Sequence, residues 1–574
     1  MGGEISHHEQ TVAVRQGLRG DESYPFDLGT YCRADVHATD YMTAVWFNRG
    51  LNWMFAFNHE EAIRCFERAL ELEPDFALAW WGIAHSHGPN YNVHQFNGYY
   101  EISNKQGGFP CQKTAFEAIQ RAALYKHRVT PAGRALIEAL QIRNVWPESK
   151  YAHLTIETYS SAMRSVYKEY PNDPDIACLF VESLMQLGPW ELFERHSFTP
   201  AKQVPELLDV LKKALASSPE HPGLNHLMIH VTEMSSDPAE GLAAAKVLRS
   251  CSPDAGHLLH MPSHTDVLVG AYCDAVKTST NAIKTDFKYV EYANNNGEEF
   301  KLYIGYISHD MHMLVYAAMM AGMEGESRAN GAALMNFVED SLKRYPARAI
   351  DLDLYHAVFY HVLVRFGKWQ DLIEQPFFEN DKLYCATNTV LHYTKGLAFA
   401  ALGNIERARE EQACFERNRK LESVYKRILH NNTAKALFAV NSEMLQGEIL
   451  YRTGQFGEAF ECLERAIALE DDLAYDEPWG QMQPIRHALG ALLLEQNQTS
   501  EAEKVFRADL KRNPNNPWSL RGLYGCLCST NSSEASTVKV LLDAALEHAD
   551  VPITYSCGCA GLPLKSPCSS TSCL

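Results

Sequence analysis

The chain has 574 residues, with 52 Lys and Arg against 71 Asp and Glu, which gives a formal net charge of −19. Hydrophobic residues make up 46% of the chain, too large a share for a disordered protein. The acidic balance argues against nucleic acid or an anionic membrane as partner, because either needs a basic surface. The sequence shows neither an apolar run of the ~18–20 residues that span a bilayer nor a secretory signal. We therefore expect a cytoplasmic protein without a membrane span, whose 15 cysteines are reduced.

The first predicted elements are two antiparallel helices between residues 48 and 74. Small and helix-closing residues fall there at the spacing of a tetratricopeptide repeat: Gly50, Ala62, Phe66, Ala69 and Pro74. The same spacing recurs downstream, at Gly447, Gly454, Ala459 and Ala466, then at Gly490, Ala502, Phe506 and Pro514, with a weaker copy at Gly396, Gly403 and Ala408. Alternating β patterns are scarce. We predict an all-α fold, a tetratricopeptide-repeat-like α-solenoid with long inserted loops.

The repeats set the expected domain boundaries. Residues 1–35 form an N-terminal extended segment, and residues 36–545 form the helical repeat array. Within the array, residues 43–76 and 440–515 are the clearest repeats and residues 220–370 are rich in histidine. Residues 546–574 are a Cys/Ser/Pro-rich tail, which we expect to be disordered.

Three long aromatic insertions interrupt the array, at residues 88–100, 284–300 and 471–484. Structured loops of this length act either as binding lids or as packing plugs, and the sequence favours neither.

Histidines form two stripes in the centre of the chain. Residues 225–233 hold His226, His230 and Glu233, and residues 256–264 hold His257, His260 and His264. At 100° per residue, each set of three falls within an arc of about 60° on its helix. His226 and His260 are 34 residues apart, and so are His230 and His264, which is the repeat period. The same alignment adds His309, His312 and His361 on later helices. In tetratricopeptide repeats generally these positions face the concave groove, so the histidines are expected to converge there.

This set of side chains predicts a transition-metal site. Imidazole is the commonest ligand for iron, copper and zinc, and an i, i+4 pair of histidines can bind one ion. The predicted ligands are His226, His230, Glu233, His257, His260, His264 and His361. Glu233 can instead be a general base, and His309 and His312 complete a second site or act as acid and base. The alternatives are that hydrogen bonds satisfy these groove histidines, or that they form a pH-sensitive peptide-binding surface.

Several motifs resemble a family of bacterial and fungal tetratricopeptide-repeat proteins related to animal tetratricopeptide repeat protein 38. They are WFNRGLNWMFAFNHEEAIRCFERAL, WWGIAHSHGPNYN, HLMIHVTE, AGHLLHMPSHT and YDEPW…QPIRHALGALL. The resemblance covers roughly residues 24–527 and implies the fold and the histidine blocks, but no particular activity.

Two functions follow from these observations. The first is a metal-dependent enzyme, an oxygenase or hydrolase that uses iron, copper or zinc on a small organic molecule in the groove, with specialised metabolism as one setting. The alternative is a non-catalytic scaffold that binds a peptide or protein partner.

Overall fold

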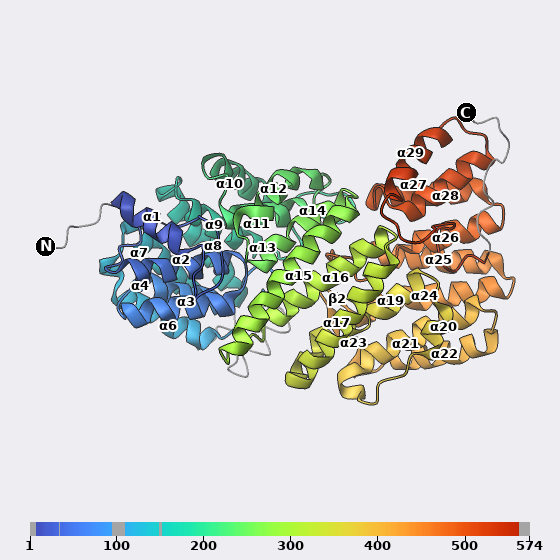
Figure 1. The fold of residues 1–574 in the computed structure, drawn as a ribbon, viewed down its shortest axis with the longest axis horizontal. Helices are drawn as coiled ribbons and strands as arrows, with labels where there is room; N and C mark the ends of the chain where they lie inside the picture. Colours follow the sequence, from blue (N-terminus) through green and yellow to red (C-terminus); the bar gives the residue numbers. More distant parts are fainter. Residues whose placement is uncertain (1–6, 34, 95–109, 148–151, 562–574) are drawn as a thin grey trace. The chain divides into compact units, whose positions relative to one another are not determined.

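The structure is a computed structural model that describes residues 7–33, 35–94, 110–147 and 152–561. Most of these residues are helical, and they include one antiparallel hairpin, in which β1 (Ile428–Leu429) pairs with β2 (Asn432–Thr433). The prediction of an all-α fold is confirmed (Figure 1). The chain divides into two compact units: unit 1 comprises residues 1–265 and 280–307, and unit 2 comprises residues 266–279 and 308–574.

The helices of unit 1 follow one another as antiparallel neighbours along the chain. They are α1 (His7–Gly17), α2 (Tyr41–Phe55), α3 (His59–Leu72), α4 (Ala77–Ser86), α6 (Gln112–Leu124), α7 (Pro131–Arg143), α8 (Ala152–Glu169), α9 (Pro174–Met185), α10 (Val204–Ser217), α11 (Pro222–Thr232), α12 (Leu242–Cys251) and α13 (Gly256–His260), with 3₁₀ turns η1 (Lys126–Arg128) and η2 (Pro238–Gly241). The chain passes between the units within α14 (Pro262–Leu268), α15 (Tyr272–Asn295) and α16 (Tyr303–Met320).

Unit 2 continues the same arrangement of paired helices. They are α17 (Glu324–Arg344), α18 (Ala349–His356), α19 (Val358–Arg365), α20 (Trp369–Glu374), α21 (Asp381–Ala401), α22 (Ile405–Asn418), α23 (Glu422–Tyr425), α24 (Ala434–Arg452), α25 (Phe456–Asp471), α26 (Ile485–Glu495), α27 (Thr499–Arg512), α28 (Pro517–Ser529) and α29 (Ala535–Ala545), with the 3₁₀ turn η3 (Pro346–Arg348). Among the described residues, no helix is both long enough and apolar enough to span a membrane.

A buried phenylalanine held between two glycines explains how the repeat helices pack. Phe66 on α3 is fully buried, and a Cβ at Gly50 on α2 or Gly82 on α4 would lie 2.6 or 2.5 Å from its ring. Only glycine therefore lets the two helices approach this ring so closely. The same arrangement recurs in unit 2, where Gly490 and Gly522 contact Phe506. The repeat spacing predicted from the sequence corresponds to this packing.

Two predicted boundaries are wrong. Residues 7–17 of the expected extended segment form α1. The expected insertion at residues 284–300 is mostly helix, because α15 continues to Asn295. Tyr289 lies on the face of this helix that packs into unit 1, where its ring is 5.9 Å from that of Trp53. Tyr289, one of the aromatic residues that indicate a loop in the sequence, is thus a core residue of a long helix.

The expected disordered tail also differs from the structure in its described part. Residues 549–561 pack against unit 2, where Cys557 and Cys559 are 7% and 4% exposed. These two cysteines form a disulfide, in contrast to the reduced thiols predicted from the sequence, whereas the other described cysteines are free. Residues 562–574 lie outside the described residues.

Candidate metal centre

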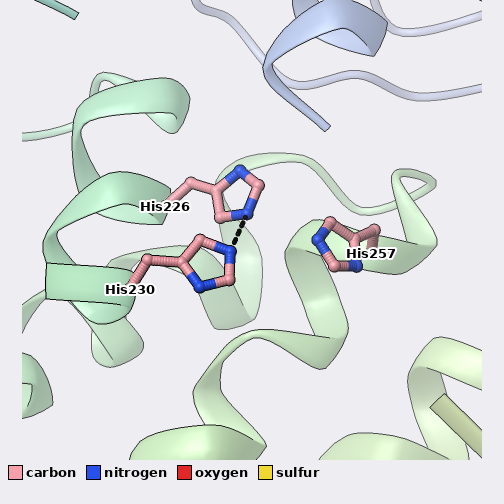
Figure 2. Close-up of side chains that lie close together, drawn as sticks. All are labelled: His226, His230 and His257. Atoms are coloured by element: carbon pink, nitrogen blue, oxygen red, sulfur yellow. Dashed lines mark hydrogen bonds between the residues drawn. The ribbon is translucent and has the colours of Figure 1, made fainter. Parts of the chain in front are cut away.

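The first histidine pair, His226 and His230, lies on α11. Pro222 occupies the first turn of this helix, and His221 caps it by accepting a hydrogen bond from the backbone N–H of Leu224. The 3.6-residue period then places the two rings one turn apart on one face. Their Nε2 atoms face each other at 3.1 Å (Figure 2).

In each ring of this pair, the other nitrogen, Nδ1, forms a hydrogen bond with an acceptor. Nδ1 of His226 lies 2.7 Å from the carbonyl oxygen of Phe55, and Nδ1 of His230 lies 2.7 Å from a carboxylate oxygen of Glu233. Neither acceptor has a hydrogen to donate, so each Nδ1 carries the proton. In a neutral imidazole the other nitrogen is then unprotonated, and two Nε2 lone pairs point at each other.

Glu233 joins this pair to a second one. Its other oxygen lies 2.7 Å from Nδ1 of His264, and Nε2 of His264 lies 2.7 Å from Nε2 of His260. The second histidine pair, His260 and His264, thus repeats the first one 34 residues later. One carboxylate orients both pairs, which is the usual role of a carboxylate behind metal-bound histidines. This geometry favours an orienting role for Glu233 over that of a ligand or a general base.

His257 on α13 completes a group of three with the first pair. One nitrogen from each of His226, His230 and His257 can be chosen so that all three lie within 4.8 Å of one another. Figure 2 shows the His257 ring reaching toward the pair from a neighbouring helix. Phe57, just beyond α2, stacks against the rings of His230 and His257. The group is therefore enclosed by aromatic and imidazole rings.

Burial disfavours the charged form of three of these imidazoles. The five histidines of the two stripes are 0–1% exposed and Glu233 is 3% exposed. Burial, and then the nearby His230, hold the pKa of His226 well below its ordinary value, and burial likewise lowers the pKa of His257 and His264. Burial alone raises the pKa of Glu233, but His230 and His264 lower it to about 2. A buried carboxylate thus accepts hydrogen bonds from two imidazole N–H groups.

The spacing within the first pair matches a bound ion. Nitrogens about 2.0–2.1 Å from one zinc-sized ion lie roughly 2.9–3.4 Å apart when the angle at the ion is about 90–110°. The 3.1 Å separation of the two Nε2 atoms falls in this range. The 2.7 Å separation in the second pair is shorter, so its rings would have to move apart by a few tenths of an ångström to hold an ion.

His309 and His312, predicted as a second site or as acid and base, lie on the part of α16 that belongs to unit 2. Nδ1 of His312 is 3.2 Å from Nε2 of His430, and Nε2 of His312 is 2.8 Å from the sulfur of Met482. The rings of His309 and His430 are 5.0 Å apart. His430 and Met482 were not predicted from the sequence, because they lie in the β1–β2 turn and in an insertion, where no periodic pattern marks them.

His361, predicted as a ligand, lies on α19 in unit 2. Its ring lines a cavity of about 30 Å³ together with Arg365, Tyr393 and the Cys557–Cys559 disulfide. Burial lowers the pKa of His361 to about 4. The structure thus places three of the predicted residues, His309, His312 and His361, in unit 2 and the other six in unit 1.

These features define an all-α protein of the helical-repeat class. Two segments match family models of the tetratricopeptide repeat, residues 43–76 in unit 1 and residues 444–473 in unit 2. The chain therefore carries tetratricopeptide repeats. No curated protein matches it.

Several solved structures are similar at low identity. The human IFIT1 dimer with m7Gppp-AAAA is 12% identical, covers 96% of each chain and gives a TM-score of 0.34. Yeast Tom70 is 12% identical over 88% of this chain and 92% of its own, with a TM-score of 0.26. The APC/C hetero-tetramer Cut9–Hcn1 is 13% identical over 90% and 97%, with a TM-score of 0.27.

The prediction of a metal-dependent enzyme acting on a small molecule is wrong. Both family matches are to a repeat whose stacked helix pairs build extended binding surfaces. Burial supplies a physical reason, because a catalytic metal needs an open coordination position that substrate can reach. The alternative, a non-catalytic scaffold, is better supported. The oxygenase or hydrolase class, taken by itself, is a prediction that no comparison tests.

Proposed function

We propose that this protein is a non-catalytic scaffold that binds an extended segment of a protein partner. The observation that carries the proposal is the match to the same repeat in both units, at residues 43–76 and 444–473. Stacked helix pairs of this kind present extended surfaces, and peptides are a common ligand of such surfaces. A relation to animal tetratricopeptide repeat protein 38 and a cytoplasmic location are part of this proposal.

The charge of the chain favours a protein over a nucleic acid as the partner. With 52 basic against 71 acidic residues, the net charge of −19 would repel a phosphate backbone. We therefore do not propose capped RNA, which the IFIT1 structure contains, as a ligand of this chain.

Selection of peptides from a random display library against the purified full-length protein tests this proposal. We expect enriched peptides that bind with micromolar dissociation constants in fluorescence polarisation. Enrichment no greater than on an unrelated protein of similar charge would contradict it.

We also propose that His226, His230 and His257 bind one transition-metal ion of the zinc, copper or iron class, which connects α11 to α13. The supporting observation is the pair of Nε2 atoms 3.1 Å apart, each opposite an Nδ1 committed to an acceptor. An ion between them turns the contact of two lone pairs into two coordinate bonds. The role is structural, since the ligands are fully buried.

Metal analysis of tag-free protein by plasma mass spectrometry tests this second proposal. We expect close to one equivalent in the wild type and less than about a tenth in His230→Ala. His127→Ala, which removes an exposed histidine of unit 1, should retain the wild-type content. A wild type that neither contains nor takes up metal would contradict the proposal.

A further inference from the structure

The end of the described chain lies across unit 2 in a non-helical conformation. We call residues 549–561 the C-terminal segment. Three polar contacts hold its last six residues. Arg365 donates through Nη2 to the carbonyl oxygen of Ser556 at 2.9 Å, Arg452 donates to that of Cys559, and the N–H of Gly561 donates to Glu495 at 2.6 Å. All three involve backbone atoms of the segment, so a different sequence could make them too.

The side chains that make these contacts are held in place by unit 2 itself. Arg365 lies over the ring of Trp518, 3.9 Å from its centroid, and donates to Nδ1 of His487 at 2.9 Å. His487 in turn donates through Nε2 to Asp509 at 2.9 Å. Glu448 holds Arg452 at 2.7 Å. Because these contacts already hold the arginine side chains in place, the arginines can bind an extended chain with little further loss of side-chain entropy.

Three side chains of the segment fit particular positions. Asp550 caps α17 by accepting from the N–H groups of Glu324 at 2.6 Å and Gly325 at 2.8 Å. Ile553 packs over Gly322, where an added Cβ would lie 2.6 Å from its Cδ1.

Gly558 is the third position. It lies so close to Gly367 that an added Cβ would meet the backbone of Gly367 at 3.0 Å and the carbonyl oxygen of Val364 at 3.2 Å. The surface thus accepts an acidic residue, an aliphatic residue three positions later and a glycine five positions after that.

We propose that this surface of unit 2 is the peptide-binding site of the scaffold and that the C-terminal segment occupies it as an internal competitor. The external ligand is an extended segment of a partner protein with the pattern acid–x₂–aliphatic–x₄–glycine. This inference rests on the proposed scaffold function and names its site and its ligand class. Because the segment is tethered, its effective concentration is in the millimolar range, so a partner must compete with it or bind when it has detached.

The test uses a fluorescent peptide with the sequence of residues 549–561, with its disulfide formed, and the full-length protein. Gly558→Leu should expel the internal segment. Gly457→Leu is the matched control, because a Cβ at this helical glycine meets nothing within 4 Å. We expect the peptide to bind Gly558→Leu at least tenfold more tightly than it binds the wild type or the control. The same peptide with leucine in place of Gly558 should not bind any of the three proteins.

Hydrogen exchange provides a second readout. The N–H of Gly561 should exchange at least tenfold faster in Gly558→Leu than in the wild type. If this variant fails to fold, Asp550→Ala serves instead, since Asp550 is exposed and its loss removes only the cap of α17. Equal peptide binding by the wild type and the folded variants would overturn the proposal.

Other outcomes separate this inference from the scaffold function. If displayed peptides bind the protein but are not displaced by the peptide of residues 549–561, the scaffold function stands and the assigned site is wrong. If Gly558→Leu instead forms concentration-dependent dimers and binds no peptide, the surface is an interface between copies, and the proposal is equally overturned.

Discussion

Replacing Glu233 by Gln isolates the contribution of the carboxylate that connects the two histidine pairs. Each of its oxygens now accepts a 2.7 Å hydrogen bond from an Nδ1, one from His230 and one from His264. A glutamine of the same shape keeps one acceptor and turns an NH₂ group toward the other imidazole. That imidazole must move its proton from Nδ1 to Nε2, which removes a lone pair from its histidine pair.

The expected cost follows from this change. Loss of an orienting carboxylate weakens a metal–histidine site by about 10–100-fold, or roughly 1.4–2.8 kcal/mol. We therefore expect Glu233→Gln to bind Zn²⁺ 10–100-fold more weakly than the wild type. Competition against a chromophoric chelator at pH 7, with metal-stripped proteins, measures this ratio.

A matched control is Glu240→Gln, which removes an exposed carboxylate of unit 1 that pairs with Lys212 at 3.0 Å. Its Zn²⁺ affinity should equal that of the wild type. Affinities of the wild type and Glu233→Gln within twofold of each other would refute the reasoning, because the carboxylate would then play no part in fixing the tautomers.

Three further predictions concern stability. Chelation should lower the melting temperature of the wild type and leave that of a His226→Ala, His230→Ala double variant nearly unchanged, since a ligand stabilises only the state that binds it. Equal shifts in the two proteins would show that these histidines do not hold the stabilising metal. Phe66→Ala should destabilise unit 1 by about 3–5 kcal/mol in urea unfolding, against less than about 0.5 kcal/mol for the 48% exposed Leu72→Ala; similar midpoints would contradict the packing role of the ring. Burial raises the pKa of Glu182 to about 7 in the folded protein. The stability that the protonated Glu182 contributes is therefore complete below about pH 4.5 and is lost as the pH rises through 7. The free energy of unfolding of Glu182→Gln, relative to that of the wild type, should therefore increase between pH 5 and pH 8, by at most about 3 kcal/mol. Parallel pH profiles of the two proteins would contradict this prediction.

The repeat architecture was predictable because its packing uses residue types that recur at fixed spacing. Gly50 and Phe66, and again Gly490 and Phe506, are 16 residues apart, and the two members of each pair contact each other in the structure. The helix through residues 284–295 was not predictable in the same way. Tyr289 packs against the distant Trp53, a tertiary contact that has no counterpart in the local sequence pattern.

The candidate site was predictable as a set of helix positions but not as a set of atoms. The 34-residue register identified both histidine pairs. The orientation of the His226 imidazole, however, depends on the carbonyl oxygen of Phe55, which lies 171 residues away in the sequence. His430 comes from a turn that follows no repeat.

Composition alone did not predict that the C-terminal segment packs against unit 2. The cysteines, serines and prolines of the predicted tail, residues 546–574, indicate disorder, and the local pattern does not reveal that residues 549–561 pack. Donors elsewhere in unit 2, Arg365 and Arg452, bind its carbonyl groups.

X-ray absorption spectroscopy of the full-length protein, as purified or reconstituted with Zn²⁺, tests most directly whether the buried histidines of this scaffold hold a metal ion. We predict a first shell of imidazole nitrogens at about 2.0–2.1 Å in the wild type, lost in His230→Ala and kept in His127→Ala. A shell of oxygen atoms alone, or a wild type that retains no ion, would contradict the proposed metal centre.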